Sequence, residues 1–423
     1  MFNAPCVLQW SAAAALLMLA GCSLVNPNAE EPAPKAAPQS VQQPAPPPPP
    51  APRPGPLEAA PALAPATSGL GEVALLMPIS GKLSSAAISL REGFMTAFYQ
   101  TPAAQRLHIR FYDTAESGIP AAVAQATRDG AELIVGPLAR DAVTAAASIS
   151  GPRAPILALN FLPAGHPVPP AFYQFALSPE DEARAAARRV LADGHHNGVA
   201  LVPTGDWGAR VLAAFKEELQ AGGGVLLSEA TFDAAVHDYS PEITQVLRIS
   251  DSRARAKRLE SVLGVKLEFE PRPRGDIEFI FAASPVNTAR LLLPQLRFHF
   301  VGGIPTYATS ESFEPHPSAN QDLEGLQFPD MPWMLGGELA DSVHDAARTA
   351  WPAGGPYRSR LYAFGFDAYL LAAALHSQGG TAQLDVQGLT GRLTLDSERR
   401  VHRDLVWGSI HNGQPRVLPP PAN

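Results

Sequence analysis

The sequence predicts an α/β protein of two similar lobes, each a doubly wound, mainly parallel sheet with helices on both faces. Apolar runs of strand length alternate with amphipathic helical stretches from about residue 71 onward, and the alternation restarts near Pro179. The runs are continuously apolar rather than alternating with polar residues, which is typical of parallel strands that are buried on both sides.

The first series of elements begins with the apolar run VALLMP at residues 73–78. A helix is predicted after it, because Leu90, Phe94, Ala97 and Phe98 follow the spacing i, i+4, i+7 and i+8 of one helix face. Further strands are predicted at residues 107–113, 132–137 and 155–160, with helices around Val123 and Val143.

The second series begins with a helix predicted over residues 180–191 and a strand at residues 198–203. The next helix has one apolar side, formed by Val211, Leu212, Phe215 and Leu219. A strand at residues 225–232, a charged helical region and a strand at residues 277–283 follow. Two consecutive doubly wound units predict two lobes that face each other across a cleft.

Residues 1–21 have the features of a lipoprotein signal peptide. An apolar run from Ala12 to Ala20 leads into the tetrad Leu19-Ala20-Gly21-Cys22, and the run is too short to span a bilayer. We expect cleavage before Cys22 and lipidation of its thiol. Because Ser23 rather than Asp follows, an outer-membrane anchor facing the periplasm is predicted.

Residues 22–70 are dominated by proline and alanine, including the uninterrupted run Pro46–Pro50. Proline lacks the backbone donor that helices and sheets need, so we expect a disordered, semi-rigid tether. At about 3.1 Å per residue it could extend to roughly 150 Å. The sequence does not separate a simple spacer from a docking segment.

The composition excludes several classes of function. A net charge of -8 argues against nucleic acid as a partner. Both cysteines, Cys6 and Cys22, lie in the leader or at its cleavage site, so no disulfide, thiol chemistry or cysteine metal site is expected beyond them. Only five lysines occur, and therefore any basic site must be built from arginine.

The sequence predicts no enzyme, catalytic residue, cofactor or metal site. The motifs of penicilloyl-serine enzymes, α/β-hydrolases, zinc proteases and P-loop proteins are all missing. His195 and His196 are adjacent and lie in an expected helix-to-strand turn, where neighbouring side chains diverge. Asp113 lies at a strand end, but no partner base can be named for it, and a single acid is weak evidence for catalysis.

The order of elements resembles the type I periplasmic-binding-protein fold of branched-chain amino-acid binding proteins. That resemblance implies three crossings of the chain between lobes, which form a hinge. It places lobe 1 at about residues 71–177 and 306–388, and lobe 2 at about residues 178–305 and 389–423.

Five strings resemble the C-terminal domain of the penicillin-binding protein activator lipoproteins, the LpoA or LppC family. They lie at residues 75–99, 267–281, 295–310, 324–335 and 389–415, and the middle three are the most particular to that family. Family members commonly carry a helical tetratricopeptide-type domain before this fold. Only the proline-rich tether occupies that place here, so we expect that domain to be missing.

The resemblance implies an outer-membrane lipoprotein that contacts and stimulates a class A penicillin-binding protein, a peptidoglycan synthase. Such an activator needs no chemistry of its own, because preferential binding to one conformation of the synthase shifts its population. The alternative is a lipid-anchored solute receptor of an ABC importer, with an amino acid or amide in the cleft.

Cleft residues are expected beyond the carboxyl ends of the strands, where open α/β sheets bind ligands. The candidates are Ser80, Gly81, Gly136 and Asn160 in the first lobe and Thr204, Asp206, Trp207 and Ser284 in the second. Each has a structural alternative: a turn for Ser80 and Gly81, a helix cap for Asp206, and packing for Trp207.

Two segments are candidates for contact with a partner. Arg253, Arg255, Lys257 and Arg258 concentrate positive charge, although such a run is also typical of a solvated helix face. Trp333, within MPWML, would anchor a partner if exposed and would belong to the lobe core if buried.

Overall fold

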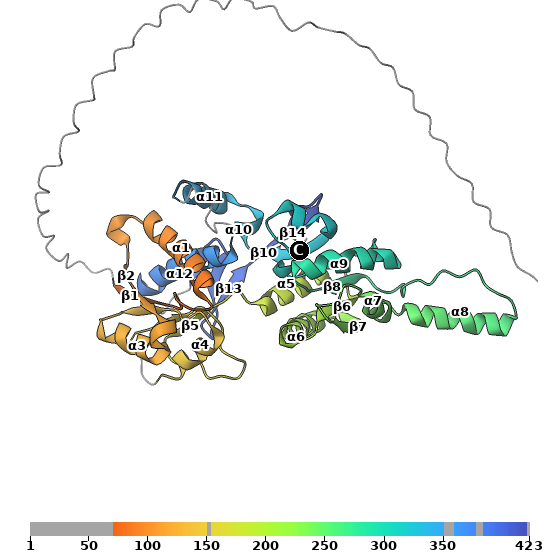
Figure 1. Ribbon diagram of the computed structural model, residues 1–423, viewed down its shortest axis with the longest axis horizontal. Helices are drawn as coiled ribbons and strands as arrows, with labels where there is room; N and C mark the ends of the chain where they lie inside the picture. The colour runs from red at the N-terminus through yellow and green to blue at the C-terminus, as the bar shows by residue number, and fades with distance from the viewer. Residues whose placement is uncertain (1–70, 150–153, 351–358, 378–383, 421–423) are drawn as a thin grey trace, which may run out of the picture. The chain divides into compact units, whose positions relative to one another are not determined.

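The computed structural model describes residues 71–149, 154–350, 359–377 and 384–420, which contain two separate β-sheets (Figure 1). The predicted signal peptide, Cys22 and the tether lie outside the described residues. Within the described part of the chain, no helix combines the length and apolar character needed to cross a membrane.

The first sheet forms one lobe together with the helices between its strands. Its strands are β1 (Glu72–Met77), β2 (His108–Asp113), β3 (Leu133–Val135), β4 (Ile156–Ala158), β5 (Phe172–Phe175), β11 (Asp385–Gln387), β12 (Arg392–Leu395) and β13 (Arg400–Asp404). The helices are α1 (Ser84–Gln100), α2 (Thr114–Ser117), α3 (Ile119–Arg128), α4 (Arg140–Ala147), α10 (Pro332–Leu335), α11 (Glu338–Ala350) and α12 (Arg360–Ser377).

The second sheet forms the other lobe. Its strands are β6 (Asn197–Pro203), β7 (Val225–Phe232), β8 (Phe279–Ala282), β9 (Thr306–Tyr307), β10 (Leu326–Asp330), β14 (Val406–His411) and β15 (Gln414–Val417). The helices are α5 (Pro179–Ala192), α6 (Asp206–Ala221), α7 (Ser240–Val246), α8 (Ile249–Leu263) and α9 (Val286–Leu296), which continues into a π-helical turn at Arg297–Val301.

Both sheets are mainly parallel, as predicted. The first has the order β11-β12-β13-β5-β4-β3-β1-β2 and the second the order β15-β14-β10-β9-β8-β6-β7. In each, an antiparallel pair, β11-β12 or β14-β15, extends the parallel strands at one edge. These late antiparallel strands were not predicted.

Each sheet is buried on both faces, which explains the continuously apolar strands. In β1, Val73, Leu75 and Met77 pack on one face, whereas Ala74 and Leu76 pack on the other. The strand β8 repeats this arrangement, with Ile280 and Ala282 opposite Phe279 and Phe281. The predicted helix face of α1 is likewise buried at Leu90, Phe94 and Ala97.

The predicted lobe boundaries at residues 306 and 389 are wrong. Thr306 pairs with Ile280 of β8, so β9 and β10 continue the second sheet, and the chain returns to the first lobe only after Asp330. Arg400 pairs with Gln174 of β5, so β12 and β13 still belong to the first sheet. The last crossing therefore falls at Leu405, between β13 and β14.

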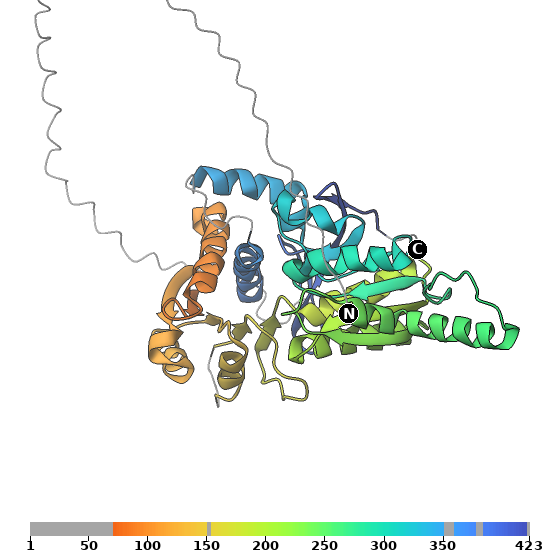
Figure 2. The same cartoon turned by 45° about the vertical axis from the view of Figure 1, so that its right-hand side comes forward.

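Helices α1 and α12 lie side by side over the first sheet, as both cartoon views show (Figure 2). Two glycines permit this approach: a Cβ atom on Gly93 would lie 1.8 Å from the carbonyl oxygen of Tyr362, and one on Gly365 would lie 1.9 Å from that of Leu90. The Tyr362 hydroxyl donates a hydrogen bond of 2.6 Å to Thr96 Oγ1 at the same contact.

Candidate functional site

A cavity of about 1210 Å³ lies between the lobes, beside two of the chain crossings. Helices α5 and α6 form the second-lobe wall, and β13 with residues 160–164 forms the first-lobe wall. The crossing residues Ala176–Ser178 and Leu405 complete the lining. Concave sites between lobes commonly hold ligands, so this cavity is the candidate functional site.

The lining of the cavity is basic, although the chain as a whole is acidic at -8. Seven arginines line it, and they outnumber the carboxylates by three. The arginines are Arg140, Arg184, Arg188, Arg189, Arg210, Arg400 and Arg403, and the carboxylates are Glu180, Asp181, Glu217 and Asp404. His402 and the apolar side chains of Phe161, Leu162 and Trp407 also line it.

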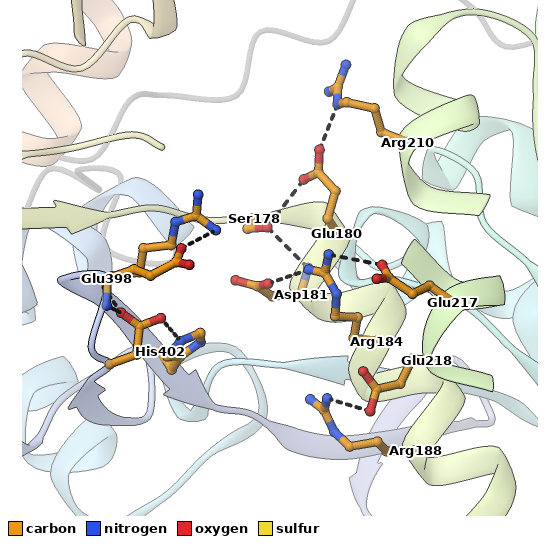
Figure 3. A network of polar contacts seen from close by, with 12 residues as sticks. Ser178, Glu180, Asp181, Arg184, Arg188, Arg210, Glu217, Glu218, Glu398 and His402 are labelled. Carbon is orange, nitrogen blue, oxygen red and sulfur yellow. Dashed lines mark hydrogen bonds and ion pairs between the residues drawn. The ribbon is translucent and has the colours of Figure 1, made fainter. Parts of the chain in front are cut away.

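Helix α5 positions the second-lobe wall. Its N-terminus is capped by Ser178, whose Oγ accepts a hydrogen bond of 3.1 Å from the backbone N–H of Asp181. Arg184 and Arg188 are four residues apart and therefore share one helix face. Arg184 contacts Asp181 at 3.0 Å and Glu217 of α6 at 3.8 Å (Figure 3).

The pairs Arg188–Glu218 (3.2 Å) and Arg210–Glu180 (2.7 Å) further join α5 to α6. Figure 3 shows a connected chain of contacts from Arg210 through Glu180, Ser178, Asp181 and Arg184 to Glu217, with the Arg188–Glu218 pair beside it. Because most of these arginines are already paired and partly exposed, each pair adds little to stability. Their shared effect is to hold several guanidinium groups in fixed positions along the cavity.

The first-lobe wall is built on the turn that enters β13. Asp396 Oδ1 accepts hydrogen bonds of 2.8 Å from the backbone N–H groups of Glu398 and Arg400, and its Oδ2 lies 2.8 Å from His402 Nε2. The Arg400 guanidinium lies 5.5 Å from the ring centroid of Phe161 and 3.6 Å from Glu398. Its Nε has no hydrogen-bond partner within the described residues.

Buried ionic groups meet where the lobes join, and we call Glu182, Asp330, Arg360 and Arg403 the hinge cluster. Arg360 of α12 donates to both carboxylate oxygens of Asp330, at 3.1 and 2.6 Å. Glu182 of α5 accepts a hydrogen bond of 3.0 Å from the backbone N–H of Ser310. Arg403 lies 3.9 Å from Glu182, and both side chains are buried, at 4% and 8% exposure.

Within the hinge cluster, the Glu182 carboxyl is partly protonated at neutral pH. Burial raises the pKa of the Glu182 carboxyl to about 7, against the opposing effects of Arg403 and Arg360. The nearby Asp330 carboxylate raises it further. The two terminal nitrogens of Arg403 have no hydrogen-bond partner within the described residues.

Of the eight predicted cleft residues, Asn160 alone lines the cavity. Its Nδ2 donates to the carbonyl of Leu138 at 3.1 Å, and its Oδ1 accepts from the backbone N–H of Phe161 at 2.9 Å. Asn160 therefore fixes the loop that carries Phe161 and Leu162 into the wall.

The other first-lobe candidates have local structural roles. Asp113 accepts hydrogen bonds of 3.1 Å from the backbone N–H groups of Ile79 and Ser80, so the turn at Ser80 and Gly81 is held from β2. Gly136 has a φ of 103°, and a Cβ there would lie 2.2 Å from the carbonyl oxygen of Leu76.

The second-lobe candidates are dispersed. Thr204 and Asp206 are exposed, and α6 begins at Asp206 rather than being capped by it. Trp207 packs against the apolar core between α5, α6 and the second sheet. Ser284 is buried, and its carbonyl accepts a hydrogen bond of 2.6 Å from Ser312 Oγ.

The predicted partner surface is found only in part at the molecular surface. Arg253, Arg255, Lys257 and Arg258 are exposed on α8. Trp333, by contrast, is 2% exposed, so its assignment to the partner surface is wrong. Its ring stacks on His344 at 3.6 Å and on Tyr362 at 5.1 Å between centroids, which makes it part of the first-lobe core.

The sequence interpretation missed Arg184, Arg188, Arg400 and Arg403 as cavity residues. A signal was present in the arginine-rich stretches ARAAARR, at residues 183–189, and RRVHRD, at residues 399–404. These stretches lie in different lobes, one in helix α5 and the other in strand β13, about 200 residues apart, and only the crossings bring them together.

Within the described ranges, no group of three His, Cys, Asp or Glu side chains is arranged to hold a metal ion. His195 and His196 lie in the turn between α5 and β6, as expected. The backbone N–H of His196 donates to Glu278 at 2.6 Å, which joins this turn to the start of β8.

The fold and the interlobe cavity define a periplasmic-binding-protein-like domain. The C-domain of LpoA from Haemophilus influenzae, a regulator of PBP1A, superimposes with a TM-score of 0.64 at 23% identity, over 82% of this chain and 99% of that one. A leucine-binding protein from Thermotoga maritima shares the fold at 16% identity and a TM-score of 0.53, over 83% and 98% of the two chains.

The chain belongs to the family described as "LppC putative lipoprotein", which matches residues 26–413. The penicillin-binding protein activator LpoA of Photobacterium profundum is 30% identical over 342 residues, 80% of this chain and 55% of that protein. The activator LpoA of Vibrio antiquarius is 28% identical over 79% of this chain and 56% of its own length. The chain thus spans about half the length of the curated relatives it matches.

Proposed function

We propose that this protein binds a class A penicillin-binding protein and stimulates its peptidoglycan synthesis. It acts as a lipoprotein anchored through Cys22 in the outer membrane and facing the periplasm. It catalyses no reaction itself. The anchor and the tether belong to the part of the chain outside the described residues, and their roles are inferred from the sequence.

The observation that carries this proposal is the 30% identity with a penicillin-binding protein activator across 80% of the chain. The missing catalytic motifs are consistent with an activator. An activator needs only differential affinity for two conformations of its target: a tenfold preference shifts the equilibrium by about 1.4 kcal/mol.

We assign the contact with the synthase to the distal half of α8. Ile249, Ser252 and Ala256 are buried at the start of the helix, whereas residues 257–263 contain no buried side chain. Figures 1 and 2 both show this helix projecting from the second lobe. A helix end without tertiary packing gains little stability from the fold, which favours a role in binding.

The distal half of α8 and the loop after it expose an apolar patch. Five of the exposed large hydrophobic residues fall within eleven positions, namely Leu259, Val262, Leu263, Val265 and Phe269. On α8 itself, Leu259, Val262 and Leu263 have the spacing i, i+3 and i+4 and share one face. Grouped exposed apolar side chains are typical of protein contact sites.

The patch adjoins the four cations Arg253, Arg255, Lys257 and Arg258. None of them makes an ion pair with any residue described in the structure. We therefore expect the complementary surface of the synthase to be an apolar groove bordered by carboxylates. Charge complementarity of this kind mainly increases the association rate and sets orientation.

The test uses the full-length lipoprotein in detergent and its cognate class A penicillin-binding protein. Binding is measured by surface plasmon resonance, and stimulation by the rate of glycan polymerisation. Val262 is 76% exposed, so Val262→Glu should leave folding intact while weakening binding at least tenfold, about 1.4 kcal/mol. Stimulation should fall in parallel.

Val417→Glu is the matched control, because Val417 is 53% exposed on β15, away from α8 in the fold. It should bind and stimulate like the wild type. Absence of both binding and stimulation by the wild-type protein would remove the proposed function. Equal losses in the two variants would remove α8 as the contact surface and leave the function standing.

A further inference from the structure

The interlobe cavity has a feature that activation of a partner does not require. Its arginines exceed its carboxylates by three, in a chain whose net charge is -8. Carboxylates just outside the lining pair with three of these arginines: Asp193 with Arg189, Glu218 with Arg188 and Glu398 with Arg400. The cationic character of the cavity therefore depends on guanidinium donors that these partners leave unmatched. The second-lobe arginines are held by pairing with α5 and α6 carboxylates, so their positions are set before any ligand enters.

Arg403 is the most informative member of this lining. Its side chain is 4% exposed, and its two terminal nitrogens make no hydrogen bond within the described residues. A buried guanidinium with unmatched donors is costly, and an anion that supplies acceptors removes that cost. The nearest carboxylate, Glu182, lies 3.9 Å away, beyond hydrogen-bond distance.

Arg400 provides a second donor on the same strand. Its Nε also lacks a partner within the described residues, and Arg400 and Arg403 both line the cavity. Burial raises the pKa of Glu182 to about 7, so this acid is partly neutral at physiological pH and leaves Arg403 less than fully compensated. Arg400 and Arg403 are three positions apart on β13 and therefore point to opposite faces of the strand, so they offer the cavity two separate guanidinium groups.

We propose that this cavity binds a short acidic peptide, with one carboxylate of the ligand on Arg403 and a second on Arg400. The volume of about 1210 Å³ exceeds the range of roughly 300–1000 Å³ that is typical for drug-sized ligands, and so it suits a molecule of several residues. Phe161, Leu162 and Trp407 supply apolar wall for the carbon skeleton of such a ligand.

The wall favours a peptide over a phosphate. Glu180, Asp181, Glu217 and Asp404 line the same cavity and would repel a densely charged anion. Those carboxylates can instead accept hydrogen bonds from the amide or ammonium groups of a peptide. The unmatched donors of Arg403 and Arg400 then select peptides that carry more carboxylates than ammonium groups.

The test is calorimetric titration of the full-length protein in detergent with four probes: Glu-Glu-Glu, Ala-Ala-Ala, Lys-Lys-Lys and pyrophosphate. Only Glu-Glu-Glu should bind. Arg403→Met should weaken that binding roughly 10- to 100-fold, the loss expected for one charge-assisted hydrogen bond. A second variant, Arg188→Ala, changes an exposed wall residue that contacts Glu218, and it should weaken the binding of Glu-Glu-Glu by a smaller factor. Because Arg188 is exposed, this variant still tests the proposal if Arg403→Met does not fold.

Arg416→Ala is the control, since Arg416 is exposed on β15 and does not line the cavity; its affinity should match the wild type. Triglutamate with blocked termini tells whether the ligand is a free peptide or an internal segment of a larger chain. Binding equal to that of unblocked triglutamate indicates an internal segment, and loss of binding indicates a free peptide. No binding of triglutamate, equal binding of trialanine, binding of pyrophosphate alone, or unchanged affinity in both arginine variants would overturn the proposal.

Discussion

Glu182 makes the stability of the fold depend on pH in a direction opposite to that of an ordinary salt-bridged carboxyl. Burial raises its folded-state pKa to about 7, above the unfolded value of 4.5, and Asp330 adds to this while Arg403 and Arg360 oppose it. Between these two values the folded state binds more protons than the unfolded state. The stabilisation is therefore complete below pH 4.5 and is lost as the pH rises through 7.

The magnitude follows from the difference of about 2.5 pH units between the two states. At about 1.4 kcal/mol per unit, Glu182 lowers the free energy of unfolding by roughly 3 kcal/mol between pH 4.5 and pH 8. Glu182→Gln removes the titrating group but can still accept the hydrogen bond from Ser310. The variant should therefore lack this decline.

Urea unfolding of wild type and Glu182→Gln, followed by circular dichroism and tryptophan fluorescence at pH 5 and pH 8, tests the reasoning. Between pH 5, where the wild type has already lost part of this stabilisation, and pH 8, the difference in free energy of unfolding between the two proteins should shift by about 2.5 kcal/mol in favour of the variant. Burial also raises the pKa of Asp367, to about 6, but it titrates in both proteins and cancels. A difference that does not change with pH would refute the assignment.

Three further substitutions test the packing of the first lobe by urea unfolding. Gly365→Ala should cost about 1–3 kcal/mol, because its Cβ would meet the Leu90 carbonyl, whereas Gly275→Ala, with open space around it, should change stability by less than about 0.5 kcal/mol. Trp333→Ala should cost about 3–5 kcal/mol, yet the folded fraction should bind the synthase normally; weaker binding would restore Trp333 to the contact surface. Asp367→Ala should cost roughly 2–5 kcal/mol, because Leu389 and Thr390 lose their buried acceptor, and a smaller loss would mean that water replaces it.

Much of the fold could be predicted because strands buried on both faces leave a strong pattern. VALLMP and IEFIFAA read as continuous apolar runs, and β1 and β8 do bury both faces. The late strands lack that pattern. The strand β9 has two residues and β10 contains Pro329, so pairing with β8 and β14, rather than local composition, decides their lobe.

The site was harder to predict because it depends on three-dimensional proximity between segments with ordinary local patterns. ARAAARR is compatible with any amphipathic helix, and RRVHRD is compatible with any exposed strand. Their convergence results from the crossing at Leu405 and the pairing of β13 with β5. The predicted residues at strand ends, such as Ser80 and Thr204, followed a rule for single sheets, whereas this cavity lies beside the crossings.

The crossing at Leu405 couples the two lobes more directly than a flexible linker would. One residue separates β13, which carries Arg403, from β14, which carries Trp407, and each strand is hydrogen-bonded into a different sheet. Any rotation of one lobe against the other must be absorbed there by the torsion angles of Asp404, Leu405 and Val406. A force applied to β13 from inside the cavity is thereby transmitted to the opposite sheet through a few covalent bonds.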